Sequence, residues 1–155
     1  MIVVSDTSAI TNLIAIRRDD LLARLFGDVV IPPAVERELQ RTHDQLPPFV
    51  RVVPLLEPDR LRDLAGEDLG AGESEAIILA VELGADLLLI DEIEGRRVAR
   101  QWHLKIIGVL GILARAKAAG LIAAVAPEIE ALVREARFWV SEEIRQEVLR
   151  NVGEA

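Results

Sequence analysis

Short runs of aliphatic residues recur along the chain and alternate with segments of helical periodicity. The strongest runs are residues 2–4, 29–31 and 87–90, and weaker ones lie at 52–53 and 106–107. Runs that are apolar on both faces are typical of central strands in a parallel sheet that is covered by helices on each side. We therefore predict that the three strong runs are central parallel strands.

Between the runs, apolar residues recur at the spacing of amphipathic helices. The expected helices are 9–26 with a break near 17–20, 33–41, 73–83, 93–102, 109–119, 128–137 and 141–150. The proline-rich stretch 42–72 predicts a loop with one short helix at 59–65. Because strands and helices alternate, the predicted fold class is α/β. A length of 155 residues fits one domain over 1–155, with C-terminal helices in 127–150 packed on it.

Charge and composition exclude several classes of protein. The net charge of −8 disfavours binding of nucleic acid through bare basic surface, but it is compatible with acids that a bound metal neutralises. Three Phe, two Trp and no Tyr offer little for base stacking, so nucleic acid would have to be held through its backbone and through metal. The absence of cysteine excludes disulfides and thiolate metal sites. We find neither a membrane-spanning run nor a signal peptide, and we expect a cytoplasmic protein.

Two aspartates follow predicted strands directly. Asp6 comes after residues 2–4, and Asp91 comes after 87–90. Ligands of open parallel sheets bind outside the carboxyl ends of the strands, where these side chains could converge. Aspartate is also a favoured helix N-cap, and Asp91 with Glu94 has the spacing of a capping box. From the residues alone, both interpretations stay open.

Two glutamates are candidates for the same crevice. Glu38 shares the apolar face of the helix 33–41, where a carboxylate is costly unless a cation or hydrogen bonds meet it; the alternative is a boundary residue that reaches Arg37 or Arg41. Glu73 precedes the apolar face of the next helix, whereas Glu75 points to the polar side. Acids in a first helical turn also complement the helix dipole, which explains both without a site.

Four carboxylates in one crevice would repel one another unless a hard cation lay among them. Mg²⁺ and Mn²⁺ prefer oxygen ligands, and such an ion can activate water beside a phosphate. If Asp6, Glu38, Glu73 and Asp91 share one crevice, a hard cation is therefore the ligand that their chemistry favours.

The ordered set of motifs resembles the PIN domain, the metal-dependent nuclease fold of VapC-type toxins. The similarity lies in Asp6 with Ser8 after the first strand, Glu38, the stretch 72–77 and Asp91 with Glu92, and the segments 111–117 and 138–141 resemble a prokaryotic PIN-like family. The resemblance implies a three-layer α/β/α domain with a central parallel sheet. It implies Mg²⁺ or Mn²⁺ on Asp6, Glu38, Glu73 and Asp91, and endonucleolytic hydrolysis of RNA.

The resemblance also implies supporting residues and partners. Ser8 would be a helper hydroxyl or a ligand, a small antitoxin protein would bind the toxin, and the chain would form a homodimer. Many toxins carry aspartate where Glu73 stands, so Glu75 competes for the role of third acid, and Glu92 is an outer ligand or a solvated charge.

Substrate contacts are the least defined part of the pattern. Arg96, Arg97 and Arg100 follow Asp91 by one to three helical turns and would either meet phosphates or form a charged outer face. The hypothesis that competes with a ribonuclease is a catalytically inactive PIN-like module that binds a partner protein through its acidic surface.

Overall fold

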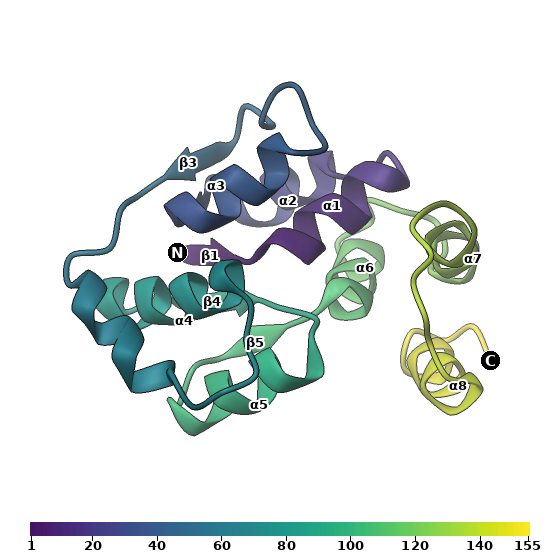
Figure 1. The fold of residues 1–155 in the computed structure, drawn as a ribbon. Helices are drawn as coiled ribbons and strands as arrows, with labels where there is room; N and C mark the ends of the chain where they lie inside the picture. The colour runs from purple at the N-terminus through teal and green to yellow at the C-terminus, as the bar shows by residue number, and fades with distance from the viewer.

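Five parallel strands form the centre of the molecule in a computed structural model that describes residues 1–155 (Figure 1). The strands are β1 (Val3–Ser5), β2 (Val29–Ile31), β3 (Val50–Val52), β4 (Leu87–Leu89) and β5 (Ile106–Ile107). Their order in the sheet is β3-β2-β1-β4-β5, and every neighbouring pair is parallel. The α/β class with a central parallel sheet is confirmed, and no predicted strand is shifted by more than two residues.

Helices fill the connections between the strands. They are α1 (Thr7–Ala15), α2 (Asp20–Phe26), α3 (Pro33–Gln40), the 3-10 helix η1 (Pro58–Leu64), α4 (Ala71–Leu83), α5 (Ile93–Gln101), α6 (Val109–Ala118), α7 (Ala126–Glu135) and α8 (Glu142–Asn151). The predicted starts of three helices are wrong by two residues, since α1, α4 and α7 begin earlier than expected. The first begins at Thr7 because Asp6 accepts a hydrogen bond from the Ala9 amide and acts as its N-cap.

Alternating side chains of each strand supply two separate cores. Val3, Leu87 and Leu89 face a first core, which they form with α1, α2, α6 and α7. Val4 and Leu88 face a second core, which they form with α4 and α5. In register, Val3 lies beside Leu87 and Val4 beside Leu88, so the alternation runs across both central strands. Helices therefore cover both faces of the sheet, which gives the three-layer α/β/α arrangement (Figure 1).

The sheet order places a topological switch point between β1 and β4. The chain adds β2 and β3 along one edge of β1 and then returns to add β4 and β5 along its other edge. The Asp6 amide donates to the Leu89 carbonyl at 3.0 Å, which continues the pairing just beyond β1. In folds of this kind, ligands bind where the connections diverge, outside the carboxyl ends of these two strands.

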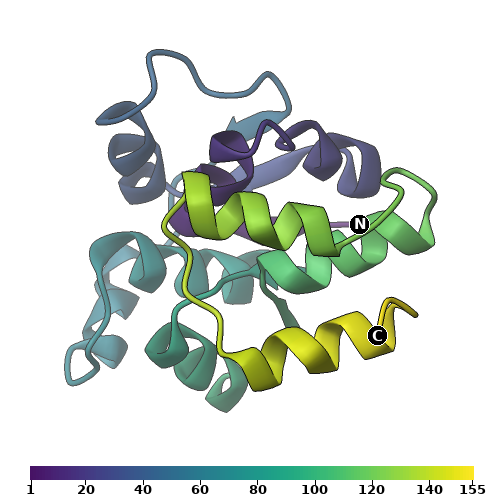
Figure 2. The same cartoon turned by 90° about the vertical axis from the view of Figure 1, so that its right-hand side faces the viewer.

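The last two helices lie along one side of the molecule (Figure 2). Ile129 and Leu132 of α7 and Leu149 of α8 are buried in the first core. No helix combines the length and the apolar character that a membrane crossing requires.

Glu154 joins the end of the chain to the start of α7. Its carboxylate accepts hydrogen bonds from the amides of Val125 at 2.7 Å and Ala126 at 3.0 Å, and Lys117 of α6 donates to it at 2.9 Å. These amides and the nearby ammonium group lower the pKa of Glu154 to about 2. The carboxylate thus caps α7 and ties α6, α7 and the end of α8 together.

We predict that Glu154→Gln destabilises the protein at neutral pH by about 1–2 kcal/mol, the usual cost of losing a charged cap. Because the folded-state pKa lies below the ordinary value, the stabilisation is full at neutral pH and is lost as pH falls through the acid range towards 2. Urea denaturation at pH 7 and pH 3 measures both effects. Glu135→Gln, which breaks only an exposed pair with Arg134, is the control and should change stability by less than about 0.5 kcal/mol. Equal stability of wild type and Glu154→Gln at pH 7 would contradict the assignment.

Candidate active site

A cavity of about 310 Å³ opens at the carboxyl ends of β1 and β4. None of the residues that line it is hydrophobic; they are Asp6, Thr7, Ser8, Thr11, Asn12, Glu38, Gly70, Glu73 and Glu92. A cavity with this lining suits a polar or ionic ligand rather than an apolar one. Three of the four acids that the sequence singles out, Asp6, Glu38 and Glu73, line this cavity.

Asp6 is the most buried acid of the site, with 1 % of its surface exposed. Its two carboxylate oxygens accept long hydrogen bonds of 3.4 Å, one from the Ser8 hydroxyl and one from the Ala9 amide. Burial raises the pKa of Asp6 well above its ordinary value, and the charges of Asp91 and Glu73 raise it further. Asp6 is therefore both a helix cap and a carboxylate held among like charges.

Glu38 reaches the site from α3. Its carboxylate accepts a hydrogen bond from the Thr7 hydroxyl and a second, at 3.3 Å, from the Gly72 amide of α4. A Cβ atom at position 72 would clash with the Glu38 carboxylate, so glycine is what allows this close approach. The expected alternative, in which Glu38 turns to Arg37 or Arg41, is wrong.

Glu73 projects into the site from the first turn of α4. One oxygen accepts from the Gly70 amide at 3.1 Å, and the other is buried without a hydrogen-bond partner. Burial raises the pKa of Glu73, with further contributions from the charges of Glu92 and Glu38. Glu73 thus keeps one carboxylate oxygen uncommitted.

Asp91, like Glu73, has one hydrogen-bonded carboxylate oxygen and one without a partner. One oxygen accepts from the Val109 amide at 2.9 Å, at the start of α6, and the other is buried without a partner. Burial raises the pKa of Asp91, while the Val109 amide and Arg96 partly offset the effect. The capping box with Glu94 is wrong, because Glu92 is the N-cap of α5 and Glu94 pairs with Arg97.

Asp91 lines a second cavity of about 360 Å³ beside the first. Ser8, Asn12 and Glu92 line both cavities, so the two adjoin at the start of α1. The side chain of Glu92 is exposed. The fourth predicted acid therefore borders the same crevice from its neighbouring compartment.

Glu75 lies outside both cavities. One of its oxygens accepts from the Ala34 amide at 3.1 Å, in the first turn of α3, and the other is 3.9 Å from Arg37. Through these contacts Glu75 links α4 to α3. Of the two competing glutamates, the structure brings Glu73 alone to the cavity.

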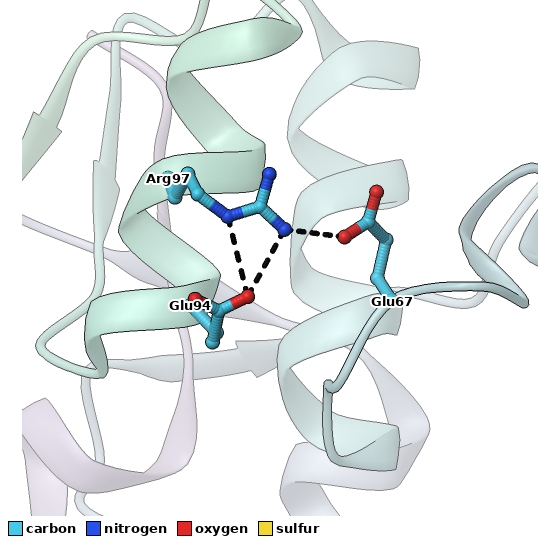
Figure 3. A network of polar contacts seen from close by, with 3 residues as sticks. All are labelled: Glu67, Glu94 and Arg97. Atoms are coloured by element: carbon cyan, nitrogen blue, oxygen red, sulfur yellow. Dashed lines mark hydrogen bonds and ion pairs between the residues drawn. The ribbon is translucent and has the colours of Figure 1, made fainter.

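The three arginines of α5 have different surroundings. Arg96 donates to the Ile90 carbonyl at 2.9 Å, and its guanidinium lies close enough to Asp91 to influence the pKa of that acid. Arg97 is paired with Glu94 of the same helix and with Glu67 of the loop between η1 and α4 (Figure 3). Arg100 is exposed. Only Arg96 is held beside a site acid, and Arg97 matches the alternative of a charged outer face.

Sequence reasoning missed the polar face of α1. Thr7, Thr11 and Asn12 line the cavity together with Ser8. Thr7 and Thr11, like Ser8 and Asn12, are four residues apart and so lie on one side of the helix. Two such polar pairs on a helix that otherwise contributes Ile10 and Leu13 to the core are the signal that identifies this face.

The donor set fits a hard divalent cation in chemistry. The buried, unpartnered oxygens of Glu73 and Asp91 and the buried carboxylate of Asp6 are ligands of the kind that Mg²⁺ and Mn²⁺ prefer. A cation would also relieve the repulsion that raises the pKa of Asp6. However, no group of three or more acidic or histidine side chains is already arranged to hold a metal ion. The site therefore contains suitable ligand atoms, but they are not already arranged around a metal position.

Comparison with known proteins identifies the family. A family model described as a PIN domain matches residues 2–154. No curated protein matches the chain.

We predict that Asp6→Asn stabilises the metal-free protein at alkaline pH, since asparagine retains the capping oxygen and removes the buried charge. A carboxyl whose folded-state pKa is raised carries no penalty when it is protonated in both states at low pH. The penalty grows as pH rises from the ordinary carboxyl range through the raised value. Urea denaturation in EDTA should therefore show the advantage of Asp6→Asn at pH 8 and its disappearance near pH 4.

Glu75→Gln is the matched control, because its hydrogen bond to α3 lies outside the cavity. We expect it to be neutral or destabilising at every pH. An Asp6→Asn protein that is less stable than wild type at pH 8 would show that the Asp6 charge is not under strain.

Proposed function

The chain belongs to the PIN domain family, and from this membership we propose that it is a metal-dependent endoribonuclease. PIN domains are a nuclease-type fold, which supports a hydrolase at this coarse level. The observation that carries the finer proposal is the pair of buried, unpartnered carboxylate oxygens on Glu73 and Asp91, two acids whose charges act on buried Asp6. In this proposal, Mg²⁺ or Mn²⁺ bound by these acids and Glu38 supports hydrolysis of RNA phosphodiester bonds.

The hydrogen bonds of the site prepare each acid for this task. The Gly70 and Val109 amides fix one oxygen of Glu73 and of Asp91, which leaves the second oxygen of each as a ligand. Thr7 orients Glu38, and Ser8 donates to Asp6. Such outer contacts orient metal ligands and tune their basicity.

A bound divalent cation would neutralise charge on the scissile phosphate and lower the pKa of a coordinated water. In the hydrolysis, a water oxygen bonds to phosphorus and the water releases a proton, while the bond from phosphorus to the leaving oxygen breaks and that oxygen gains a proton. Arg96, fixed beside Asp91, is the cation of α5 best placed to face the phosphate.

We extend the proposal to the toxin of a toxin–antitoxin pair. Support comes from the similarity of the ordered motifs to VapC-type toxins. A small antitoxin protein would bind the chain, and the chain would form a homodimer. Co-purification of the chain with the product of a small neighbouring reading frame, and relief of growth inhibition by that product, test this extension. Growth inhibition that the neighbour does not relieve would contradict it.

A second candidate is a PIN-like module that binds a partner without turnover. The absence of a preformed ligand cage favours this candidate. It predicts a folded protein that cuts no RNA with either ion and retains one partner chain.

We predict that Asp6→Asn abolishes Mn²⁺ binding in calorimetry and lowers RNA cleavage at least about a hundredfold, because loss of a direct ligand should exceed the usual effect of losing an outer contact. Glu75→Gln is the matched control in the same helix as Glu73 and should retain both activities. Equal Mn²⁺ binding by wild type and Asp6→Asn would refute the site. Binding of Mn²⁺ without cleavage of RNA would instead favour the binding module.

A further inference from the structure

A large aromatic side chain that lines the second cavity is exposed. Trp139, in the segment that joins α7 to α8, is 80 % exposed, and Ile93 at the start of α5 is 81 % exposed. Both line the cavity of about 360 Å³ that Asp91, Glu92 and Ser8 also border. Figure 2 shows this connecting segment crossing the side of the molecule between α7 and α8. Two exposed apolar side chains thus border a cavity that adjoins the acidic site.

The segment that carries Trp139 is fixed by its neighbours. Phe138 and Val140 pack against the first core, so the side chains alternate between the core and solvent. The Phe138 amide donates to the Leu132 carbonyl at 3.1 Å, and Ser141 caps α8 by accepting from the Ile144 amide at 3.2 Å. Trp139 is therefore presented outward from a backbone that is held at both ends.

Arg137 adds a cation to the same cavity wall. Its backbone adopts a left-handed conformation with φ of 52°, which is unfavourable for a residue with a side chain. Glycine would adopt this turn without strain, yet the chain places an exposed arginine there. The cavity consequently combines an aromatic surface and a guanidinium beside the acids of the site.

We propose that this second cavity binds a nucleobase of single-stranded RNA, which stacks on Trp139 and packs against Ile93 while Arg137 contacts the flanking phosphate. This proposal rests on the proposed function and assigns the substrate residue next to the scissile bond. Stacking on an exposed aromatic side chain with a nearby cation is the usual mode of single-strand binding, and double-stranded RNA does not offer a free base face.

The surroundings favour a nucleotide over a protein partner. The polar walls contributed by Ser8 and Asn12 suit a ligand with polar edges rather than a purely apolar segment, and Arg137 is the cation of this cavity that a phosphate can meet. Asp91, one of the proposed metal ligands, also lines this cavity, so a base seated here continues into a strand at the metal. The low aromatic content of the chain predicted little stacking, but one exposed tryptophan beside the site is enough for one base.

The two tryptophans differ in a way that permits a direct test. Trp102 is partly buried against the second core and lies under the guanidinium of Arg60, 5.7 Å from the ring centre. Trp102→Phe therefore leaves Trp139 as the sole fluorescent reporter of the cavity. We would titrate this variant with a six-nucleotide single-stranded RNA in Ca²⁺, checking that the RNA stays intact, and with an abasic ribose-phosphate chain of the same length.

We expect RNA to quench and shift the Trp139 emission and the abasic chain to leave it unchanged. By fluorescence anisotropy of labelled RNA, Trp139→Ala should bind about tenfold to a hundredfold more weakly, and Trp139→Phe should retain most of the affinity. Leu56→Ala removes an equally exposed apolar side chain far from the cavity and should bind as wild type.

RNA that binds without quenching, or binds Trp139→Ala as tightly as wild type, would overturn the proposal. So would a Trp139→Ala variant whose only change is its oligomeric state by size-exclusion chromatography, since that result assigns the surface to a protein interface. The readout is independent of turnover: stacking without cleavage in Mn²⁺ refutes the nuclease alone, and cleavage without stacking refutes the base site alone.

Discussion

The burial of like charges at the ends of β1 and β4 is the constraint on which the rest of the site depends. Asp6 is almost fully buried, and the nearby carboxylates of Asp91 and Glu73 raise its pKa together with burial. An arrangement of this kind is unfavourable in isolation, because buried carboxylates lose hydration and repel one another. The fold nevertheless maintains it with specific hydrogen bonds, which is the physical basis of the proposed cation-binding function.

The two carboxylate oxygens of Glu73 have the same kinds of surroundings as those of Asp91. In each, one oxygen accepts from a backbone amide at the start of a helix, and the other is buried and free. The amides belong to the starts of α4 and α6, so helix N-termini on opposite faces of the sheet stabilise the acids electrostatically. The same helices pack the two cores, so the stability of the domain and the arrangement of the site depend on the same secondary-structure elements.

The sequence was sufficient to predict the parallel sheet, its strands to within two residues and the side on which the acids gather, because uninterrupted aliphatic runs have few other uses in a chain of this size. It was insufficient for contacts between distant segments. The bond from Glu75 to the Ala34 amide, the cap that Asp91 provides to α6 and the exposure of Trp139 depend on tertiary packing. Helical spacing favoured Glu73 over Glu75 as the inward acid, although the resemblance left the two in competition, and only Glu73 lines the cavity.

The central claim is that Asp6, Glu73 and Asp91 jointly bind a divalent cation. Crystals soaked in Mn²⁺ and measured near the manganese absorption edge test it most directly, because anomalous scattering locates the ion without reference to activity. The account predicts an anomalous peak bounded by the free oxygens of Glu73 and Asp91 and the carboxylate of Asp6, and no such peak in Asp6→Asn. A wild-type crystal with no peak there, or with Mn²⁺ only on surface acids, would contradict it.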